Sequence, residues 1–397
     1  MTDHVSCPVC AGPEALAVLR RTEAPVFVNV TYPTAEDAMR APARDMDVRY
    51  CPGCGLLFNP AYDPAALTFD GQYENDQGLS SKFAAHEEES IGRILRLLEG
   101  APRVSVVEIG CGQGGFLRRL AARLDRPATL IGYDPALQRA IRSAGQHEET
   151  IGRADVRLVP RRFSAAEPIG DADAVLFLMR AVFEYMDAPL ELLTELRRRA
   201  GRFARGLICL EITSLETILA SRTLFDIYYE YGRYYGAASI GAALARAGWG
   251  AASATPVLDQ RYLWVESSCE GEAKPLGRPL GAAEIRSLAA ADEAMRSSWS
   301  DKIRDAAQKG PVAVWGGAGK GLNFVSMIDP DRRLIDCVID INPLKQGRFT
   351  PRTGHPVVSP QTAVQRGVRS ACVLNPIYRA EIARQVAGLG ADIDLIL

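Results

Sequence analysis

The sequence predicts a multidomain α/β protein, and three observations support this prediction. Two long segments alternate apolar, strand-like runs with amphipathic helical runs, which is typical of doubly wound sheets with helices on both faces. A segment rich in Pro and Cys precedes the first of these blocks, and one long charged helical stretch joins the two. A chain of 397 residues is also too long for a single compact core.

The composition excludes several classes of protein. With 47% hydrophobic and 24% charged residues, the chain is neither fibrous nor wholly disordered. A formal charge of −2 provides no basic field for a nucleic-acid backbone or a membrane surface. No secretory signal is visible, and apolar runs such as 174–179 are far shorter than the roughly 20 residues that cross a bilayer. We therefore expect a cytoplasmic protein that acts on a small molecule, and the sequence leaves its oligomeric state open.

We divide the chain into three domains, at 1–66, 67–270 and 271–397. The first carries β-like stretches at 25–32 and 48–50. The second opens with a helix over 80–99, for which Ser80 or Ser81 is the N-cap and Gly100 the C-cap. Its alternation predicts strands at 104–110, 129–134, 155–159, 174–179 and 206–212, with helices at 116–124, 135–145 and 190–199.

The third domain follows an amphipathic helix predicted over 282–308, which is a bridge between the two α/β blocks. The alternation then restarts. It predicts strands at 312–316, 334–340, 371–374 and 393–397, and a helix at 322–328. The two blocks are not obvious repeats of one another in sequence.

Four of the nine cysteines form two C-x2-C doublets, Cys7 with Cys10 and Cys51 with Cys54. Each doublet sits in a turn of small residues, where backbone N–H groups approach a thiolate, and two doublets supply four soft ligands for one tetrahedral zinc ion. A full set of four ligands makes the zinc structural. A redox pair would be expected beside a βαβ unit, and the segment between the doublets has too few basic residues for a nucleic-acid-binding ribbon.

A glycine-rich loop follows the strand at 104–110 and opens the next helix. It can be read as a dinucleotide-binding loop, with an acidic residue at the end of the next strand to hold a ribose, or as a bare turn. An acidic residue inside the first strand would repel a pyrophosphate, but it suits a cationic sulfonium ligand that carries an ammonium group. The residues concerned are Glu108, Gly110, Gly112, Gly114, Gly115 and Asp134.

This E-x-G-x-G-x-G pattern resembles motif I of class I S-adenosylmethionine (SAM) methyltransferases. That resemblance implies that the glycines face the amino-acid part of SAM and that Asp134 binds the ribose hydroxyls. The order of parts along nearly the whole chain resembles the bacterial sugar C-methyltransferase family. It implies a class I SAM methyltransferase Rossmann-like sheet, flanked by an N-terminal zinc-binding domain and a C-terminal Rossmann-like α/β domain.

Five motifs carry the family resemblance, in the family's order. They are Tyr73-Glu74-Asn75 with Ser80, Ser81 and Phe83; Arg180 to Tyr185; Phe225 to Tyr231 (FDIYYEY); Gly316 to Gly321 (GGAGKG); and Asp340 to Pro351. The resemblance implies catalytic roles for Tyr73, Tyr228, Glu230 and Tyr231, and a cofactor contact for Arg180. It also implies that the C-terminal domain faces the substrate's nucleotide or phosphate, with Lys320, Asn323 and Lys345 as the binding candidates.

The chain departs from the family at its histidines. Ala181 and Tyr185 replace the two histidines of the second motif, and Tyr229 and Tyr231 replace those of the third. The four histidines present lie elsewhere, and we expect His86 to be a partly exposed helical residue. In addition, Gly321 follows Lys320, so the second glycine loop is not a phosphate-binding Walker loop.

The resemblance implies that a base removes a proton from carbon beside the ketone of a nucleotide-linked keto sugar, and that the enolate attacks the methyl group of SAM. Tyrosine, with a pKa near about 10, is a poor base at neutral pH compared with histidine at about 6.5. Tyr231 would need a lowered pKa or a role as hydrogen-bond donor, which leaves Glu230 as the base. Three alternatives stay open: O- or N-methylation of another small molecule, a non-catalytic SAM-binding relative, and an NAD-dependent oxidoreductase.

Overall fold

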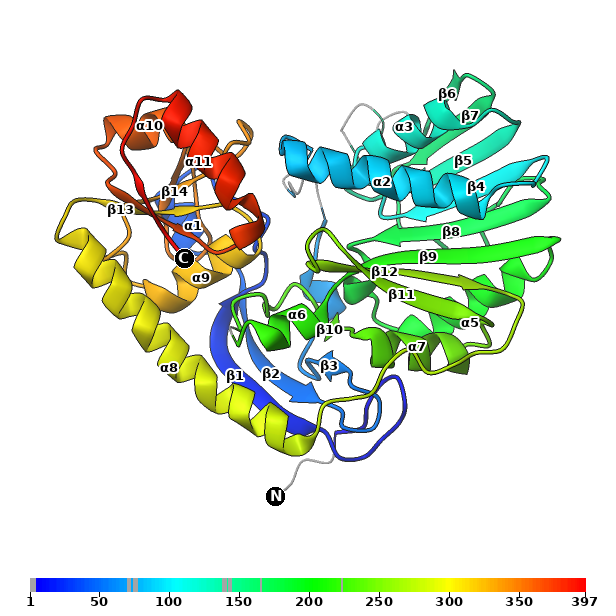
Figure 1. Ribbon diagram of the computed structural model, residues 1–397, viewed down its shortest axis with the longest axis horizontal. Helices are drawn as coiled ribbons and strands as arrows, with labels where there is room; N and C mark the ends of the chain where they lie inside the picture. Colours follow the sequence, from blue (N-terminus) through cyan, green and yellow to red (C-terminus); the bar gives the residue numbers. More distant parts are fainter. Residues whose placement is uncertain are drawn as a thin grey trace.

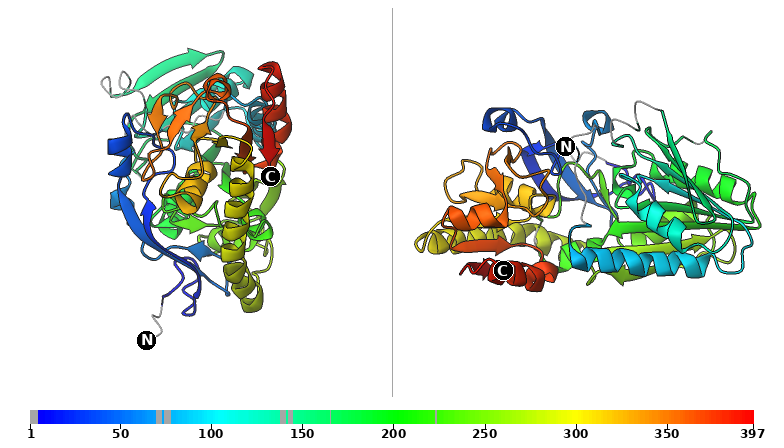
Figure 2. Two further views of the ribbon diagram at one scale, coloured as in Figure 1. Left: turned by 90° about the vertical axis from the view of Figure 1, so that its left-hand side faces the viewer. Right: turned by 90° about the horizontal axis from the view of Figure 1, so that it is seen from above.

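The computed structural model describes residues 5–69, 73, 78–137, 141, 145–164, 166–222 and 224–397. Its described strands form three sheets (Figure 1). Two α/β units lie on either side of a small N-terminal sheet, and the two views of Figure 2 agree with this arrangement. The expected α/β architecture with a cysteine-rich N-terminal segment is confirmed.

The N-terminal sheet has four antiparallel strands: β1 (Leu16–Pro25), β2 (Ala43–Tyr50), β3 (Leu57–Phe58) and β10 (Arg233–Tyr234). A short helix, α1 (Ala35–Met39), begins where the Thr34 side chain accepts the backbone N–H of Asp37. The β-like stretch predicted at 25–32 is wrong except at its ends, where Pro25 closes β1 and Tyr32 forms an isolated antiparallel bridge with Phe349. The apolar residues of this stretch are buried against the other parts of the molecule. Their run of apolar side chains therefore reflects burial and not pairing in a strand.

The central sheet has the strand order β11-β12-β9-β8-β4-β5-β7-β6. The five strands from β9 to β7 are parallel, while β12 and β6 run antiparallel to their neighbours. The order along the chain reverses beside β4, and open α/β sheets bind ligands at such a switch point. The strands are β4 (Val104–Ile109), β5 (Ala128–Tyr133), β6 (His147–Ile151), β7 (Ala154–Val159), β8 (Ala174–Arg180), β9 (Arg205–Thr213), β11 (Ala252–Val257) and β12 (Tyr262–Ser268).

Helices α2 (Ser81–Leu97), α3 (Gly115–Arg123), α5 (Pro189–Ala200) and α7 (Ala237–Arg246) cover both faces of the central sheet, whereas α6 (Leu215–Ala220) packs beside the N-terminal sheet. The Ser80 hydroxyl accepts the N–H of Phe83, so the predicted N-cap of α2 is confirmed. The C-cap is Leu98, two residues before the expected glycine. Most of the helix predicted at 135–145 lies outside the described residues. Two short 3-10 helices, η1 (Pro64–Ala66) and η2 (Phe183–Tyr185), lie beside the sheet.

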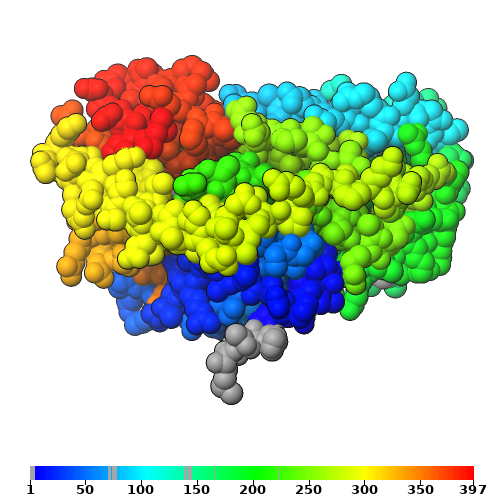
Figure 3. Space-filling model, turned by 60° about the horizontal axis from the view of Figure 1, so that its bottom comes forward, coloured from blue at the N-terminus to red at the C-terminus, as the bar shows by residue number. Residues whose placement is uncertain are grey.

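The C-terminal sheet has the order β15-β16-β14-β13-β17-β18 and is parallel except for β15. Its elements are α8 (Ala282–Ala307), β13 (Val312–Trp315), α9 (Lys320–Ile328), β14 (Cys337–Ile339), β15 (Arg348–Phe349), β16 (Pro356–Val358), α10 (Pro360–Gln365), β17 (Ser370–Val373), η3 (Pro376–Tyr378), α11 (Arg379–Gly388) and β18 (Asp394–Ile396). The predicted bridging helix is thus α8. It lies along the N-terminal sheet, and Figure 3 shows it over the N-terminal segment.

The proposed boundaries at 66 and 270 separate the three sheets with one exception. Strand β10 comes from the middle segment but pairs with β3 in the N-terminal sheet. The largest group of buried apolar side chains also draws on all three segments. Across the described ranges, no helix combines the length and apolar character that a membrane span requires.

Candidate functional site

Two neighbouring cavities lie at the carboxyl ends of the central strands. The larger has a volume of about 670 Å³ and is lined by the first glycine loop, the ends of β5 and β8, and residues of α2. The smaller, of about 190 Å³, lies between the central sheet and the C-terminal unit. Leu79, Ala181 and Tyr262 line both, so the two cavities meet at these residues.

The first glycine loop brings backbone close to the larger cavity. Gly110, Gly112 and Gly114 all have left-handed φ angles, between 55° and 79°. A Cβ at Gly110 would lie 2.3 Å from Val182 Cγ2, so only glycine fits there. Asp134 Oδ2 accepts the Gly112 N–H at 2.8 Å, and its Oδ1 accepts the Ala136 N–H at 2.7 Å. The loop, Asp134 and Glu108 therefore come together as the sequence predicted, with Gly114 behind the lining, against Leu158.

Three charged side chains form a row across adjacent strands on the floor of the larger cavity. Glu108 of β4 lies opposite Leu178 of β8, and Arg180 is two residues further along β8. Arg180 in turn lies opposite Glu211 of β9. Successive alternate residues of a strand share a face, so Glu108, Arg180 and Glu211 point the same way. Burial raises the pKa of Glu108 to about 8, and its Oε2 has no hydrogen-bond partner among the described residues.

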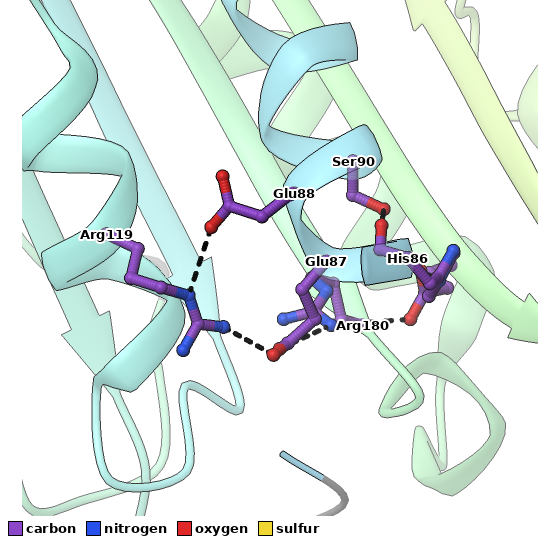
Figure 4. Close-up of polar contacts among 7 residues, drawn as sticks. His86, Glu87, Glu88, Ser90, Arg119 and Arg180 are labelled. Carbon is purple, nitrogen blue, oxygen red and sulfur yellow. Dashed lines mark hydrogen bonds and ion pairs between the residues drawn. The ribbon is translucent and has the colours of Figure 1, made fainter. Parts of the chain in front are cut away.

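Arg180 is the centre of a buried ionic network (Figure 4). Its Nη2 lies 3.0 Å from Glu87 Oε1 and 3.6 Å from Glu211 Oε1, and its guanidinium lies 3.9 Å from the centre of the Phe116 ring. Glu87 also contacts Arg119 of α3. On the far side, His86 Nε2 lies 2.7 Å from Glu211 Oε2.

This network corrects one expectation. His86 is buried, not partly exposed, and its ring stacks on Tyr262. The 17-residue helix α2 turns this face inward because its apolar residues, Phe83, Ile91 and Ile94, pack on the central sheet. Burial disfavours the charge of Glu211, but Arg180 and His86 outweigh it and lower the pKa of that carboxyl.

The smaller cavity contains a second glycine loop at the end of β13. Asp340 Oδ2 accepts the Gly317 N–H at 2.7 Å, and its Oδ1 accepts the Asn342 N–H at 2.8 Å. Lys345 lines this cavity, and its Nζ donates to the Gly317 carbonyl at 3.2 Å. Asp340 thus holds the second loop as Asp134 holds the first.

The other two predicted substrate residues lie behind that lining. Lys320 Nζ is 2.7 Å from Asp226 Oδ2, and it is Asp226 that lines the cavity. Asn323 is fully buried: its Nδ2 donates to the carbonyls of Phe225 and Ile227, and its Oδ1 accepts from Arg21. The structure therefore gives Asn323 an anchoring role that joins β1, α9 and the tyrosine-rich segment.

The tyrosine-rich segment places its members on different sides of one carboxylate. Tyr228 and Tyr231 line the smaller cavity, and Tyr73 lines the larger. Glu230 is fully buried and belongs to neither lining. Its Oε1 accepts from the Tyr185 hydroxyl at 3.1 Å, and that hydroxyl lies 2.7 Å from the Tyr73 hydroxyl.

The titration behaviour of this cluster favours a carboxylate over a phenolate as the base. Burial raises the pKa of Glu230, against hydrogen bonds from Tyr73, Val28 N–H, Asn29 and Tyr185. Burial likewise raises the phenol pKa of Tyr231, and it places those of Tyr73 and Tyr185 well above the usual value. Tyr231 therefore does not meet the first condition set for it, a lowered pKa, and the Tyr185 hydroxyl donates to Glu230.

The four cysteines of the two doublets converge at the N-terminus, as expected. Their sulfur atoms all lie within 4.8 Å of one another, with Cys7 and Cys54 at 3.6 Å and Cys10 and Cys51 at 3.4 Å. Four thiolates at about 2.3 Å from a tetrahedral zinc would be about 3.8 Å apart, so the cluster fits a metal. Both turns close alike: the N–H four residues after the first cysteine donates to that cysteine's carbonyl.

Sequence reasoning missed several residues at the cavities. Glu87, Glu211, Asn29, Arg261 and Tyr262 were not singled out. Glu211 carried a usable signal, because it is an acid inside an apolar strand, as Glu108 is. Tyr262 carried none, since the hairpin of β11 and β12 was not predicted. Glu74 and Asn75, the remainder of one family motif, lie outside the described residues.

Comparison with protein families gives two matches in the expected order. Residues 83–253 match a methyltransferase domain, and residues 282–392 match a C-methyltransferase C-terminal domain. No curated protein matches the chain.

The solved structures that match the chain are distant in sequence. A putative O-methyltransferase from Nostoc punctiforme is 16% identical, covers 47% of this chain and 57% of its own, and has a TM-score of 0.33. An O-methyltransferase family protein from Burkholderia thailandensis is 15% identical, covers 52% and 65%, and has a TM-score of 0.34. A SAM-dependent methyltransferase from Aquifex aeolicus is 16% identical, covers 53% and 100%, and also scores 0.34. The chain thus spans less than two thirds of the first two proteins.

The fold and the family matches define a SAM-dependent methyltransferase. More particularly, a match to a methyltransferase domain is followed by a match to a C-methyltransferase C-terminal domain, and the resemblance inferred from the motifs is confirmed at that level. The oxidoreductase alternative falls with this assignment.

Proposed function

We propose that the protein transfers the methyl group of SAM to carbon in a nucleotide-linked keto sugar, or a sugar-like metabolite, in a biosynthetic pathway. The observation that supports this most is the junction of the two cavities at Ala181 and Tyr262. One cavity has the residue set for SAM and the other has a second nucleoside-type loop. A substrate that fills the second cavity would therefore present its reacting end to the first.

In this proposal, SAM occupies the larger cavity. Its ammonium group pairs with Glu108, whose buried oxygen otherwise lacks a partner. Gly110 and Gly112 admit its amino-acid part to the backbone, Gly114 supports the loop from behind the lining, and Asp134 binds the ribose. When bound, SAM supplies an electrophilic methyl group on a sulfonium. The protein's task is then to position the substrate and generate its nucleophile.

The nucleotide of the substrate occupies the smaller cavity. Asp340 ends the second strand of a βαβ unit, the position that binds ribose hydroxyls in such units. Lys345 lines this cavity and brings a positive charge to an anion. Lys320 supports this role through Asp226, and Asn323 holds the loop's helix in place.

Glu230 is the proposed base, and it acts through phenols. The carboxylate reaches neither cavity, so a tyrosine must relay the proton. The hydroxyl oxygen of Tyr185 or Tyr73 takes the proton from the substrate carbon, and the same hydroxyl gives its own proton to Glu230. Tyr228 and Tyr231 donate to the enolate oxygen that forms. The carbon then takes the methyl group, and the C–S bond breaks.

O- or N-methylation is the second candidate, and one observation favours it. No histidine lines either cavity in the described ranges, and the carboxylate base is separated from them by tyrosines. A hydroxyl or amine substrate would need less basic assistance than a carbon acid.

The four cysteines are proposed to hold one structural zinc ion. All four ligand positions are filled by the protein, so no position is open for catalysis. Elemental analysis of the purified protein should give one zinc per chain, and Cys51→Ser should lose it.

Deuterium exchange tests the proposed reaction. Nucleotide-linked 4-keto-6-deoxy sugars would be incubated with the enzyme in D2O, with and without SAM, and analysed by mass spectrometry. We expect exchange above the enzyme-free rate and a methyl mass gain when SAM is present. Glu230→Gln should abolish both while leaving SAM affinity unchanged, and Glu293→Gln, at an exposed glutamate of α8, should behave as wild type. Wild-type rates in Glu230→Gln would remove that base, and a methyl gain without exchange would direct mapping to oxygen or nitrogen.

A further inference from the structure

Glu230 is a buried carboxyl group with no cation beside it. Its side chain is fully buried, and no lysine, arginine or histidine among the described residues lies within ion-pair distance of it. A buried carboxylate without a counter-ion is stabilised only by the neutral donors around it. These donors therefore decide how readily Glu230 takes up a proton.

Two of the donors come from the N-terminal segment. Val28 N–H donates to Glu230 Oε2 at 2.7 Å, and Asn29 Nδ2 lies 3.1 Å from Oε1 and 3.4 Å from Oε2. The Asn29 side chain is buried and lines the smaller cavity. An amide oxygen in the place of Nδ2 would face two carboxylate oxygens, so the amide must turn its nitrogen to Glu230. On this side Asn29 only donates.

The same amide nitrogen fixes the direction of the neighbouring hydroxyl groups. Asn29 Nδ2 also donates to the Tyr73 hydroxyl oxygen at 3.2 Å, so the Tyr73 proton points away from the amide. On its other side, Tyr73 lies 2.7 Å from the Tyr185 hydroxyl, which donates to Glu230 at 3.1 Å. Tyr73 and Tyr185 both line the larger cavity, so these hydroxyls lead from that cavity to the carboxylate.

Contacts with the C-terminal unit hold the segment that carries Asn29. One residue before it, the Val28 carbonyl accepts the Gly319 N–H at 2.8 Å. Three residues after it, Tyr32 and Phe349 exchange backbone hydrogen bonds at 2.8 and 2.9 Å. Asn29 is therefore fixed from both sides, and one of its anchors is the second glycine loop.

We propose that Asn29 is a positioning residue for proton removal: its amide holds the Glu230 carboxylate and turns the Tyr73 hydroxyl proton toward that carboxylate. This inference rests on the base proposed above, and it makes the N-terminal segment part of the reaction centre. Without the amide, Glu230 loses a donor that favours its charged form, so its pKa should rise further. The Tyr73 proton also loses its fixed direction, which should slow the transfer.

The titratable groups that face Glu230 are phenols, and burial raises the pKa of each. They therefore stay protonated between about pH 5 and 9, where a carboxyl group titrates. These phenols belong to Tyr62, Tyr73, Tyr185, Tyr228 and Tyr231. The charged groups that act on these phenols in turn are Glu184, Asp226 and Arg233.

Deuterium exchange without SAM measures proton removal alone. A nucleotide-linked 4-keto-6-deoxy sugar would be incubated with the full chain in D2O from about pH 5 to 9 and analysed by mass spectrometry. Asn29→Leu, of similar size but with no donor, should exchange about 10- to 100-fold more slowly at pH 7. The acid limb of its pH profile should move up by about one pH unit. Asn29→Asp, which places a second carboxyl against Glu230, should move the limb at least as far.

The matched control is Thr31→Val. Thr31 is buried in the same segment, and its Oγ1 accepts from Arg348 at 3.0 Å, but it has no hydrogen bond to Glu230. This variant should keep the wild-type pH profile.

Infrared difference spectra follow the Glu230 carboxyl group in the ligand-free protein. The band that disappears in Glu230→Gln identifies this carboxyl and separates it from Glu184 and Asp226. The pH midpoint of the band should rise by about one unit in Asn29→Leu and stay unchanged in Thr31→Val.

The outcomes separate this inference from the proposed function. A wild-type acid limb and band midpoint in a folded Asn29→Leu protein overturn the inference, and so does an equal displacement in Thr31→Val. If Asn29→Leu fails to fold by circular dichroism, Asn29→Asp decides. If the wild-type protein exchanges no deuterium with any sugar of the panel, the proposed reaction falls, and the proton-transfer role of Asn29 falls with it. Wild-type exchange with an unmoved limb in the variants overturns only this inference.

Discussion

The two glycine loops of this protein are built alike and differ in charge. In the first, Gly110 N–H donates to the Tyr133 carbonyl at 2.7 Å, and in the second, Gly316 N–H donates to Ile339 at 2.8 Å. Each loop then donates to an aspartate that ends the next strand, and each aspartate also accepts the N–H two residues after itself.

The difference lies beneath the loops. Two residues before Gly110 stands the buried acid Glu108, and two residues before Gly316 stands the buried apolar Val314. The first floor therefore suits a cationic ligand, and the second, with Lys345 nearby, suits a neutral or anionic one. The backbone of each loop fixes where a nucleoside lies, and single side chains beneath the loop set which ligand charge is favoured.

The largest expected effect comes from adding one carbon to each loop. Gly110→Ala would place Cβ 2.3 Å from Val182 at a φ of 79°, and Gly321→Ala would place it 1.9 Å from the Gly316 carbonyl oxygen. We expect Gly110→Ala to lower SAM affinity at least about 100-fold, and Gly321→Ala to leave it within about threefold. Calorimetry with SAM, with circular dichroism to confirm folding, checks both. Loss of SAM binding in a folded Gly321→Ala protein would show that the loops are not independent.

The aspartates offer a milder version of the same comparison. Asp134→Asn replaces an oxygen that accepts a backbone N–H with a donor, which leaves a buried group unsatisfied at about 1–3 kcal/mol. SAM affinity should therefore fall about 10- to 100-fold. Asp340→Asn makes the same change in the second loop and should not alter SAM affinity, while raising KM for whichever nucleotide-linked sugar is turned over. Equal SAM affinities in the two variants would contradict the assignment of the first loop to SAM.

Local patterns were sufficient to predict most of this architecture. The switch from alternation to helical spacing located both βαβ blocks, and the Ser80 cap located the start of α2. The spacing of the two C-x2-C doublets predicted the cysteine cluster, because two such doublets supply the four thiolates of one tetrahedral metal site. These features depend on neighbours within a few residues, which the sequence displays directly.

Features that depend on long-range packing were not predictable in this way. The apolar run 26–31 reads as a strand, but Val28 N–H donates to Glu230 and its carbonyl accepts from Gly319, so it is a buried connector between domains. Likewise, nothing near Asn323 or His86 in sequence reveals that each bonds to segments at least 96 residues away. Polar residues mark a site only when their distant partners are known.

The smallest and most specific effect tests the acid that distinguishes the two loops. Since the pKa of Glu108 is raised to about 8 by burial, the free protein at pH 7 holds this group mostly protonated. Pairing with an ammonium favours the carboxylate, so SAM binding should release most of one proton at pH 7 and weaken as the pH falls below about 8. Titrations in two buffers of different ionisation enthalpy measure that proton. Glu108→Gln should release none, and an unchanged release would place the proton elsewhere.

The same substitution should change the stability of the ligand-free protein in a predictable direction. Folding raises the pKa of Glu108 from 4.5 to about 8. Its contribution to folded-state stability is therefore fully present below pH 4.5 and is lost as the pH rises to about 8. Above that pH, the contribution no longer changes. The wild-type melting temperature should therefore fall more than that of Glu108→Gln between pH 5 and 8. The second loop has the apolar Val314 at the equivalent position and so carries no such cost. In the first loop, a cationic ligand would offset the cost of burying the ionised Glu108. Parallel pH curves for the two proteins would mean that folding does not raise the pKa of Glu108, and the proton release expected on SAM binding would then be lost as well.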